Sequence, residues 1–240
     1  MKERLDKILA SQGAFSRSEA RQLVRGGRVR VNGVPAKAAD EKADPQSDQI
    51  TVDGKAFAYR QFVYIMLNKP QGVVSASESP GDVTVIDLIP PVLKRPGLFP
   101  AGRLDKDTTG FVLVTDDGAF AHEILSPKKH VEKTYVAHLA RRIPAEEQKR
   151  FEQGVTLADG YECLPAAICE LNDDGTLVEI RLREGKYHQI KRMAAACGSH
   201  VVALHRAAMG ALTLDESLAP GECRLLTEKE KKMIVDPFDS

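Results

Sequence analysis

The chain has 240 residues, 42% of them hydrophobic, and its 34 Lys and Arg residues balance its 34 Asp and Glu residues. This apolar content can form the core of one large domain, or of a small domain joined to a larger one, and the zero net charge excludes a global attraction to polyanions. No apolar run approaches the ~18 residues that span a bilayer, and we see no signal peptide. We therefore expect a cytoplasmic, soluble protein without a membrane partner. The four cysteines form no C-x-x-C pair, so we expect buried free thiols.

Charge is distributed unevenly along the chain. The first 35 residues contain eight basic and three acidic side chains, a net charge of +5, so the remainder sums to −5. A basic module on a mildly acidic body favours binding of a polyanion, although a solvated helical face explains the same charges equally well.

Two short amphipathic helices are expected over residues 3–12 and 17–26, where apolar residues recur at helical spacing. Ser16, with Glu19 three residues later, predicts a capping box at the start of the second helix, and two consecutive glycines predict its end. Four arginines at three- and four-residue spacing would share one helical face, where their mutual repulsion favours intervening phosphates. They are Arg17, Arg21, Arg25 and Arg28.

The rest of the first module is predicted to be a small β structure. Val29–Val31 alternates as a strand and runs into Asn32-Gly33, a dipeptide typical of a tight hairpin turn. Ile50–Val52, followed by Asp53-Gly54, repeats the pattern. Composition changes over residues 55–61, where we expect a linker. We accordingly divide the chain into a module at residues 1–58 and a larger domain at residues 59–240.

The larger domain alternates short strands with short helices. Strands are predicted to outnumber helices, and turns join many neighbours. This favours an α+β fold, built on a mostly antiparallel mixed sheet with flanking helices, over a doubly wound parallel sheet. Strands are expected over residues 62–67, 111–115, 133–139, 166–171, 176–182 and 201–214, and helices over 117–125, 144–153, 187–197 and 227–234.

Common cofactor motifs are missing from the sequence. We find no Rossmann glycine fingerprint, P-loop or nucleophile elbow. The six histidines have no metal-ligand spacing. If the protein is an enzyme, we expect its chemistry to need neither cofactor nor metal.

The segment Gly102–Gly110, with sequence G-R-L-D-K-D-T-T-G, precedes a predicted buried strand. A short polar loop bounded by glycines on a rigid scaffold is a common place for reactive side chains. Asp105 or Asp107 is the candidate carboxylate, although Asp105, taken alone, could instead cap the turn.

The predicted helix over residues 187–197 suggests a partner for that carboxylate. Helical phase places Lys191 at the edge of the apolar stripe, and a lysine at a core boundary needs a partner. We infer an Asp105–Lys191 pair, which would keep the carboxylate ionised and oriented as a nucleophile or base. The stripe itself comprises Tyr187, Ile190, Met193, Ala194 and Cys197.

Residues 1–55 resemble the RNA-binding domain typified by small-subunit ribosomal protein S-four. The resemblance rests on R-L-D-K at residues 4–7, S-R-S-E-A at 16–20 and G-R-V-R-V-N-G at 27–33. It implies recognition of structured RNA through shape and phosphates. The implied RNA contacts are Arg4, Lys7, Arg17, Arg21, Arg25 and Arg28.

The body resembles RNA pseudouridine synthases, and more narrowly those that modify 16S ribosomal RNA. The segments G-R-L-D-K-D-T-T-G, E-K-T-Y at residues 132–135 and E-G-K-Y-H-Q-I-K-R-M at 184–193 carry the resemblance. Residues 66–72, 204–206 and 218–222 extend it over nearly the whole chain. Large-subunit relatives tend to differ at T-T-G, at E-K-T-Y and at the Tyr-His pair.

The resemblance implies a cofactor-free, monomeric enzyme that isomerises uridine 516 of 16S ribosomal RNA. Asp105 would be the essential carboxylate, Tyr135 would stack on the flipped uracil, and Lys191 would pair with the aspartate. Asp107 would stabilise the loop. The implied RNA contacts in the body are Arg103, His188, Gln189 and Arg192.

Two alternatives stay open at this stage. The same chemistry could act on 23S ribosomal RNA. The chain could also be a non-catalytic ribosome-assembly protein, which would not require Asp105, Tyr135 and Lys191 to converge.

Overall fold

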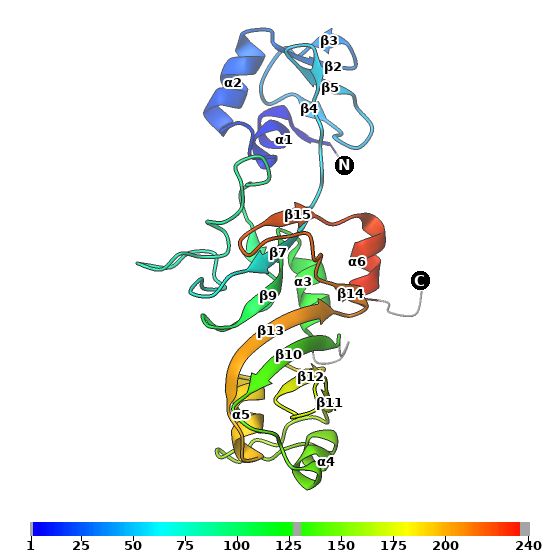
Figure 1. The fold of residues 1–240 in the computed structure, drawn as a ribbon. Helices are drawn as coiled ribbons and strands as arrows, with labels where there is room; N and C mark the ends of the chain where they lie inside the picture. The colour runs from blue at the N-terminus through cyan, green and yellow to red at the C-terminus, as the bar shows by residue number, and fades with distance from the viewer. Residues whose placement is uncertain (1, 127–130, 236–240) are drawn as a thin grey trace. The chain divides into compact units, whose positions relative to one another are not determined.

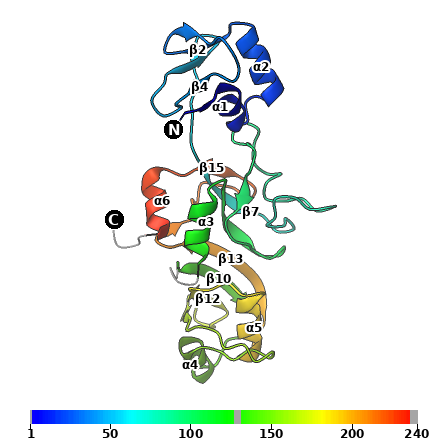
Figure 2. The same cartoon turned by 180° about the vertical axis from the view of Figure 1, so that it is seen from behind.

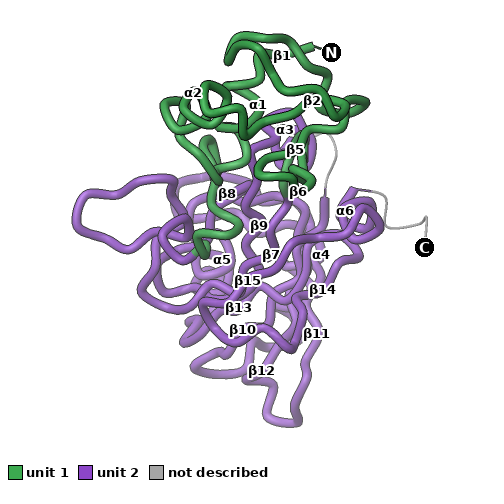
Figure 3. The backbone as a smooth tube through the Cα atoms, turned by 90° about the horizontal axis from the view of Figure 1, so that it is seen from above, with its two compact units in different colours: residues 1–63, 89–98 green, residues 64–88, 99–240 purple. Residues whose placement is uncertain are grey.

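A computed structural model of the protein describes residues 2–126 and 131–235, and the chain forms two compact units (Figures 1 and 3). Unit 1 contains Met1–Val63 and Ile89–Leu98, and unit 2 contains Tyr64–Leu88 and Phe99–Ser240. Unit 1 is therefore larger than the predicted 1–58 module, because it includes a segment from the middle of the chain. The assignment of separate functions to residues 1–58 and 59–240 stays a prediction.

The helices of unit 1 are α1 (Leu5–Ser11) and α2 (Arg17–Arg25). The predicted capping box is confirmed: the Ser16 hydroxyl accepts from the Glu19 N–H at 3.2 Å, and the Glu19 carboxylate accepts from the Ser16 N–H at 2.7 Å. Because α2 ends at Arg25, Arg28 lies beyond the helix. The prediction that Arg28 shares a helical face with the other three arginines is wrong.

Small sheets complete unit 1. Both predicted turns are confirmed, since their central residues have the positive φ that such turns require: 51° and 81° at Asn32-Gly33, and 51° and 76° at Asp53-Gly54. The sheet order is β3-β2-β5-β6, and β1 pairs separately with β4. The strands are β1 (Glu3–Arg4), β2 (Val29–Val31), β3 (Val34–Pro35), β4 (Lys42–Ala43), β5 (Ile50–Val52) and β6 (Lys55–Ala56). Strand β6 occupies the start of the expected linker.

Specific contacts tie the Ile89–Leu98 segment to the rest of unit 1. The Arg95 guanidinium donates to the carbonyls of Arg60 at 2.9 Å and Gln61 at 2.8 Å. Gly13 has φ +77°, and a Cβ atom there would collide with the carbonyl oxygen of Lys94. The segment therefore packs against Gly13 without room for a side chain.

Unit 2 is built on a nine-stranded mixed sheet with the order β11-β12-β10-β13-β9-β7-β15. Strand β14 pairs with β13, and β8 pairs with β9. The β13–β9 pairing is parallel and the other pairings are antiparallel, which confirms the expected mostly antiparallel α+β fold. The strands are β7 (Tyr64–Lys69), β8 (Phe99–Pro100), β9 (Thr109–Thr115), β10 (Lys133–Leu139), β11 (Ala167–Glu170), β12 (Leu177–Leu182), β13 (Val201–Met209), β14 (Leu212–Thr213) and β15 (Cys223–Leu225).

Helices α3 (Gly118–Leu125) and α6 (Glu228–Val235) share a core with strands β7 and β9 (Figure 2). The Asp117 carboxylate accepts from the Phe120 N–H at 3.0 Å and from the Tyr64 hydroxyl at 2.6 Å, so one side chain caps α3 and links it to the sheet. The core includes Tyr64, Met66, Phe111, Leu113, Phe120, Ile124 and Ile234.

The remaining helices are α4 (Ala145–Gln153) and α5 (Gln189–Ala196). Helix α5 begins two residues later than expected, because His188 has the left-handed backbone φ of 49°. Tyr187 therefore lies outside the helix and is 76% exposed, so the prediction that it is buried is wrong. The other four members of the predicted stripe are buried.

The four cysteines are free. Cys163 and Cys197 are buried and Cys223 is half-buried, but Cys169 is exposed, so the expectation of burial is wrong for Cys169. Within residues 2–126 and 131–235, no helix is long and apolar enough to cross a membrane.

Candidate active site

The loop with the candidate aspartates lies between β8 and β9, and its backbone geometry requires the glycine at its end. Gly110 has φ +101°, and a Cβ atom there would collide with the backbone of Arg206 on the neighbouring parallel strand. Arg206 is 3% exposed, and its Nε donates to the carbonyl of Phe111 at 2.6 Å. These contacts fix the point where the loop enters β9.

Lys69, at the end of β7, forms hydrogen bonds to the backbone of this loop. Its side chain is completely buried, and Nζ donates to the carbonyl oxygens of Thr108 at 2.7 Å, Pro70 at 3.1 Å and Lys106 at 3.3 Å. Burial lowers the pKa of Lys69 to about 8, against the opposing effect of nearby Asp107 and Asp105. The ammonium therefore stabilises loop carbonyls on the C-terminal side of Asp105.

Ser75 and Gly72 complete this support. The Ser75 hydroxyl donates to the Leu104 carbonyl at 3.1 Å and accepts from the Leu104 N–H at 3.0 Å, while the Gly72 N–H donates to the Lys106 carbonyl at 2.8 Å. The backbone is thus held on both sides of Asp105. Neither Lys69 nor Ser75 was predicted from the sequence to support the site. No local pattern indicated a role for Lys69, which follows Asn68 at the polar end of β7.

Lys191 lies between the two aspartates. Its Nζ is 3.1 Å from Asp105 Oδ2, which confirms the predicted pair, and 2.6 Å from Asp107 Oδ1. Burial alone would lower the pKa of Lys191, but the hydrogen bonds to Asp107 and Asp105 raise it overall. The hydrogen bond from Lys191 lowers the pKa of Asp107. Asp107 therefore does more than stabilise the loop, because it shares the ammonium with Asp105.

Tyr135 completes the constellation from β10, where Ile180 of β12 and Arg206 of β13 are its cross-strand neighbours. Its side chain is 8% exposed and lines a cavity of about 80 Å³. Asp105 and Lys191 line the same cavity, so the three predicted catalytic residues converge. Their individual catalytic roles stay predictions. The lining also includes Arg103, Leu104, Thr108, Leu182, Lys186, His188, Gln189 and Leu204.

The predicted RNA contacts in unit 2 differ in their surroundings. Arg103 is exposed at the cavity, and His188 Nε2 is 3.6 Å from Asp105 Oδ1. Arg192 forms an ion pair with Asp159 at 2.5 Å. Gln189 is only 4% exposed; its Nε2 donates to Glu184 at 2.5 Å and its Oε1 accepts from the Lys186 N–H at 2.9 Å.

The Gln189 amide is buried and both of its polar atoms are used within the protein, although the residue lines the Asp105 cavity, so its assignment as an RNA contact stays a prediction. Its bonds fix the segment that precedes α5, including His188. Gln189 therefore holds in place the backbone of a segment that lines the cavity.

The predicted RNA contacts in unit 1 fall into two groups. Some are matched with acids: Arg4 and Arg21 with the buried Asp6 at 3.0 and 3.3 Å, Lys7 with Glu3 at 2.7 Å, and Arg28 with Asp53 at 2.6 Å. Arg17 and Arg25 are exposed on α2 and form no ion pair within the described part of the chain. These two guanidiniums are the ones most available to an incoming phosphate.

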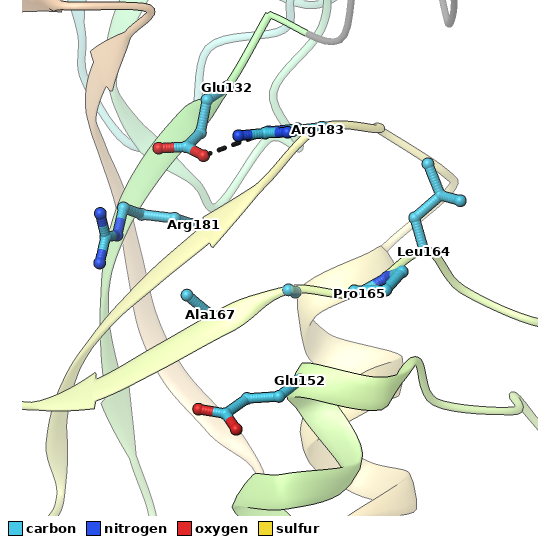
Figure 4. Close-up of a pocket in the computed structure, with 8 residues that line it drawn as sticks. Glu132, Glu152, Leu164, Pro165, Ala167, Arg181 and Arg183 are labelled. Carbon is cyan, nitrogen blue, oxygen red and sulfur yellow. Dashed lines mark hydrogen bonds and ion pairs between the residues drawn. The ribbon is translucent and has the colours of Figure 1, made fainter.

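A larger cavity of about 460 Å³ lies elsewhere in unit 2 (Figure 4). Arg183 and Glu132, which point toward each other there, form an ion pair at 3.4 Å. Arg181 pairs in register with Thr134, the neighbour of Tyr135, so its side chain lies on the opposite face of the sheet from Tyr135. None of the predicted site residues lines this cavity, which is bounded by Glu132, Glu152, Leu164, Pro165, Ala166, Ala167, Arg181 and Arg183.

The described residues contain no group of three His, Cys, Asp or Glu side chains that could hold a metal ion. His130 lies outside them. The chemical groups that converge at the loop are a carboxylate pair, an ammonium and a phenol. They can supply a nucleophile or base, a fixed positive charge and a proton-transfer group.

Comparisons with known proteins agree with this geometry. Residues 63–196 match the family model for RNA pseudouridylate synthase, and residues 3–50 match the S4 domain. The uncharacterized RNA pseudouridine synthase YtzG of Bacillus subtilis is 50% identical over 98% of this chain and 99% of its own length. Ribosomal small subunit pseudouridine synthase A of Escherichia coli is 44% identical over 97% of this chain and 100% of its own length.

A solved structure gives the same result. The chain matches a crystal structure described as a pseudouridylate synthase with a TM-score of 0.67 and 38% identity, covering 97% of this chain and 100% of that one. The match to the family model spans more than half of the chain and includes the Asp105 loop, Tyr135 and Lys191. This protein belongs to the RNA pseudouridine synthase family, with an S4 RNA-binding domain at its N-terminus.

Proposed function

We propose that this enzyme isomerises one uridine of 16S ribosomal RNA, at position 516, to pseudouridine. The supporting observation is the convergence of Asp105, Tyr135 and Lys191 on one cavity in a chain that matches a small-subunit enzyme over nearly its full length. The T-T-G, E-K-T-Y and Tyr-His segments favour the same target. Ribosomal RNA as the substrate also places the protein in the cytoplasm, where we expect it to act as a monomer.

The reaction requires the target base to leave the helical stack. Uracil must detach from the ribose, rotate and rejoin through its carbon five, which a stacked and paired base cannot do. Flipping the nucleotide costs a few kcal/mol. In our proposal the flipped uracil stacks on Tyr135, whose ring faces the same cavity as Asp105.

Asp105 is the proposed reactive group. It either attacks the anomeric carbon and displaces the uracil, or removes a proton from the neighbouring ribose carbon; both routes are compatible with its place at the cavity. In either route the N-glycosidic bond breaks, a carbon–carbon bond forms, and the proton lost from carbon five balances the one gained at nitrogen one. No oxidant or cofactor is consumed.

The support around Asp105 fits this task. Lys191 lies 3.1 Å from its carboxylate, and Lys69 and Ser75 hold the loop backbone on either side. A carboxylate fixed in advance loses little freedom in the transition state, and such positioning can contribute several kcal/mol to catalysis.

The direct test is Asp105→Asn, assayed for pseudouridine in 16S RNA, with Asp82→Asn as the matched control. Asp82 is a partly exposed carboxylate that pairs with Lys106 of the Asp105 loop at 2.6 Å. We expect Asp105→Asn to abolish product, because an amide is neither nucleophile nor base, and Asp82→Asn to retain nearly full turnover. Undiminished turnover by Asp105→Asn would disprove its assignment as the catalytic carboxylate.

The RNA target is tested in a deletion strain by mapping pseudouridine in both ribosomal RNAs. We expect one site to disappear from 16S RNA and to return with the wild-type chain but not with Asp105→Asn. Loss of a site from 23S RNA instead would establish the large-subunit alternative. An unchanged pattern in both RNAs would exclude a ribosomal target.

A further inference from the structure

Tyr187 is an exposed aromatic residue beside the catalytic cavity that the mechanism above does not use. Its side chain is 76% exposed, and its ring stacks on His188 with centroids 3.8 Å apart and planes 19° from parallel. Successive side chains in a helix or strand point in widely different directions. Two consecutive rings in a parallel stack therefore need a special backbone conformation between them.

That conformation is the left-handed backbone of His188, with φ 49° and ψ 34°. A residue with a Cβ atom adopts this conformation only at a cost in conformational energy, and such strain is concentrated at functional sites. The surrounding bonds maintain it: the Arg192 guanidinium donates to the Tyr187 carbonyl at 3.4 Å and is itself anchored to Asp159. Gln189 holds the backbone of Lys186. The exposed ring is thus built on a fixed support.

The stack extends outward from the reacting centre. His188 Nε2 lies 3.6 Å from Asp105 Oδ1, and Tyr187 is the next ring beyond it. His188 covers one face of the Tyr187 ring, while most of the side chain stays open to solvent. Lys186 and Arg103 line the same cavity and supply positive charge for an RNA backbone.

We propose that the exposed face of Tyr187 stacks on one nucleobase of the substrate RNA, next to the flipped uridine. Base stacking on aromatic side chains is the usual way in which proteins hold unpaired nucleotides, and every base has a face that can stack. This stacking platform, the Tyr187 ring, would keep the RNA strand in place while the target uridine occupies the cavity. This inference rests on the proposed function, because it requires RNA at the Asp105 loop.

The first experiment compares Tyr187→Ala, Tyr187→Leu and Tyr187→Phe on a 16S RNA fragment, with KM and kcat separated and unfolding midpoints measured. Leu171→Ala is the control, since Leu171 is 48% exposed and lines none of the cavities described above. Stacking predicts that Tyr187→Ala lowers kcat/KM roughly 10- to 100-fold, chiefly through KM. Tyr187→Phe should restore activity to within about twofold, because the platform needs the ring and not the hydroxyl. Tyr187→Leu should be impaired like Tyr187→Ala, because leucine has no aromatic ring on which a base can stack.

A binding measurement makes the test independent of turnover. RNA carrying 2-aminopurine at each position around the target is titrated with Asp105→Asn and with Asp105→Asn/Tyr187→Ala. We expect quenching at one neighbouring position with the first protein and its loss with the second. Equal quenching by both, or a Tyr187→Ala variant as active as Leu171→Ala, would overturn the platform. A wild-type enzyme that forms no pseudouridine in any RNA would instead refute the proposed function, which separates the two failures.

Discussion

Lys69 in unit 2 and Arg21 in unit 1 show two different uses of a basic side chain. Lys69 is fully buried and donates to three carbonyl oxygens around the Asp105 loop. Arg21 keeps 48% of its side chain exposed while it pairs with Asp6, and Arg17 and Arg25 on the same helix are exposed without an ion pair in the described residues. The first arrangement fixes a geometry, and the second presents a charged surface.

The difference follows from solvent. A buried ammonium interacts in a medium of low dielectric and cannot move without leaving carbonyls unpaired. An exposed guanidinium is screened by salt and rearranges at little cost. Changes in unit 2 should therefore affect turnover, while changes on α2 should affect RNA affinity and its salt dependence.

The largest effect is expected for Lys69→Met. The substitution keeps most of the side-chain volume but removes the donor to the Lys106 and Thr108 carbonyls of the loop and to the Pro70 carbonyl beside it, so Asp105 should lose its fixed position. A misplacement of about 1 Å can cost roughly 100-fold in rate, and we expect kcat to fall by that order with little change in KM. Single-turnover pseudouridine formation measures it.

Lys106→Met is the control for this prediction, because it makes the same substitution in the same loop. The Lys106 side chain is 57% exposed and pairs only with Asp82 among the described residues. We expect kcat within about twofold of wild type, in line with the small contribution of exposed pairs. Equal losses in the two variants would mean that burial of Lys69 does not set the loop geometry.

An intermediate effect, on stability, is expected for Asp6→Asn in unit 1. The Asp6 side chain is fully buried and accepts from Arg4 and Arg21, and the hydrogen bond from Arg4 lowers its pKa below the ordinary value of 3.8. Hydrogen bonds to a charged group contribute about 1.5–3 kcal/mol. We expect unit 1 to lose about 2 kcal/mol of unfolding free energy at pH 7, measured by chemical denaturation.

The contribution of Asp6 to the unfolding free energy should decrease as the pH falls. Because the folded-state pKa of Asp6 is depressed, its contribution is fully present above the unfolded value of 3.8 and is lost as the pH falls through the folded pKa. The difference between wild type and Asp6→Asn should therefore be constant from pH 7 to about pH 5 and shrink below about pH 4. A difference that stays constant into acid would show that Asp6 stabilises unit 1 without its charge.

Local patterns predicted much of this fold from the sequence. The capping box at Ser16, both glycine turns and strand β10 follow from short-range chemistry, and the structure confirms them. The two-residue strands β8 and β14 were not separable from loops or longer strands, because their pairing with β9 and β13 is decided by tertiary contacts.

The site was only partly predictable for the same reason. Helical phase correctly paired Lys191 with Asp105. It failed for Tyr187, because periodicity assumes that the helix continues, and the left-handed backbone of His188 ends it first. The role of Lys69 was not predicted, because no local pattern shows that the end of β7 contacts the Asp105 loop, which follows almost forty residues later in the chain. That contact depends on the antiparallel pairing of β7 with β9.

The smallest effect is expected for Arg17→Ala/Arg25→Ala, and its salt dependence is more informative than its size. If both guanidiniums meet phosphates, the slope of log affinity against log salt should become shallower by about 0.7–0.9 per lost contact. Lys149→Ala/Arg150→Ala removes the same charge from α4, where both side chains pair with glutamates, and should leave the slope unchanged. In both variants kcat at saturating RNA should match wild type, since none of these residues contacts the Asp105 loop. Equal slopes for the wild type and both double variants would show that α2 is not part of the RNA interface. A loss of kcat in Arg17→Ala/Arg25→Ala would contradict the division between an exposed surface that sets RNA affinity and a buried site that carries the chemistry.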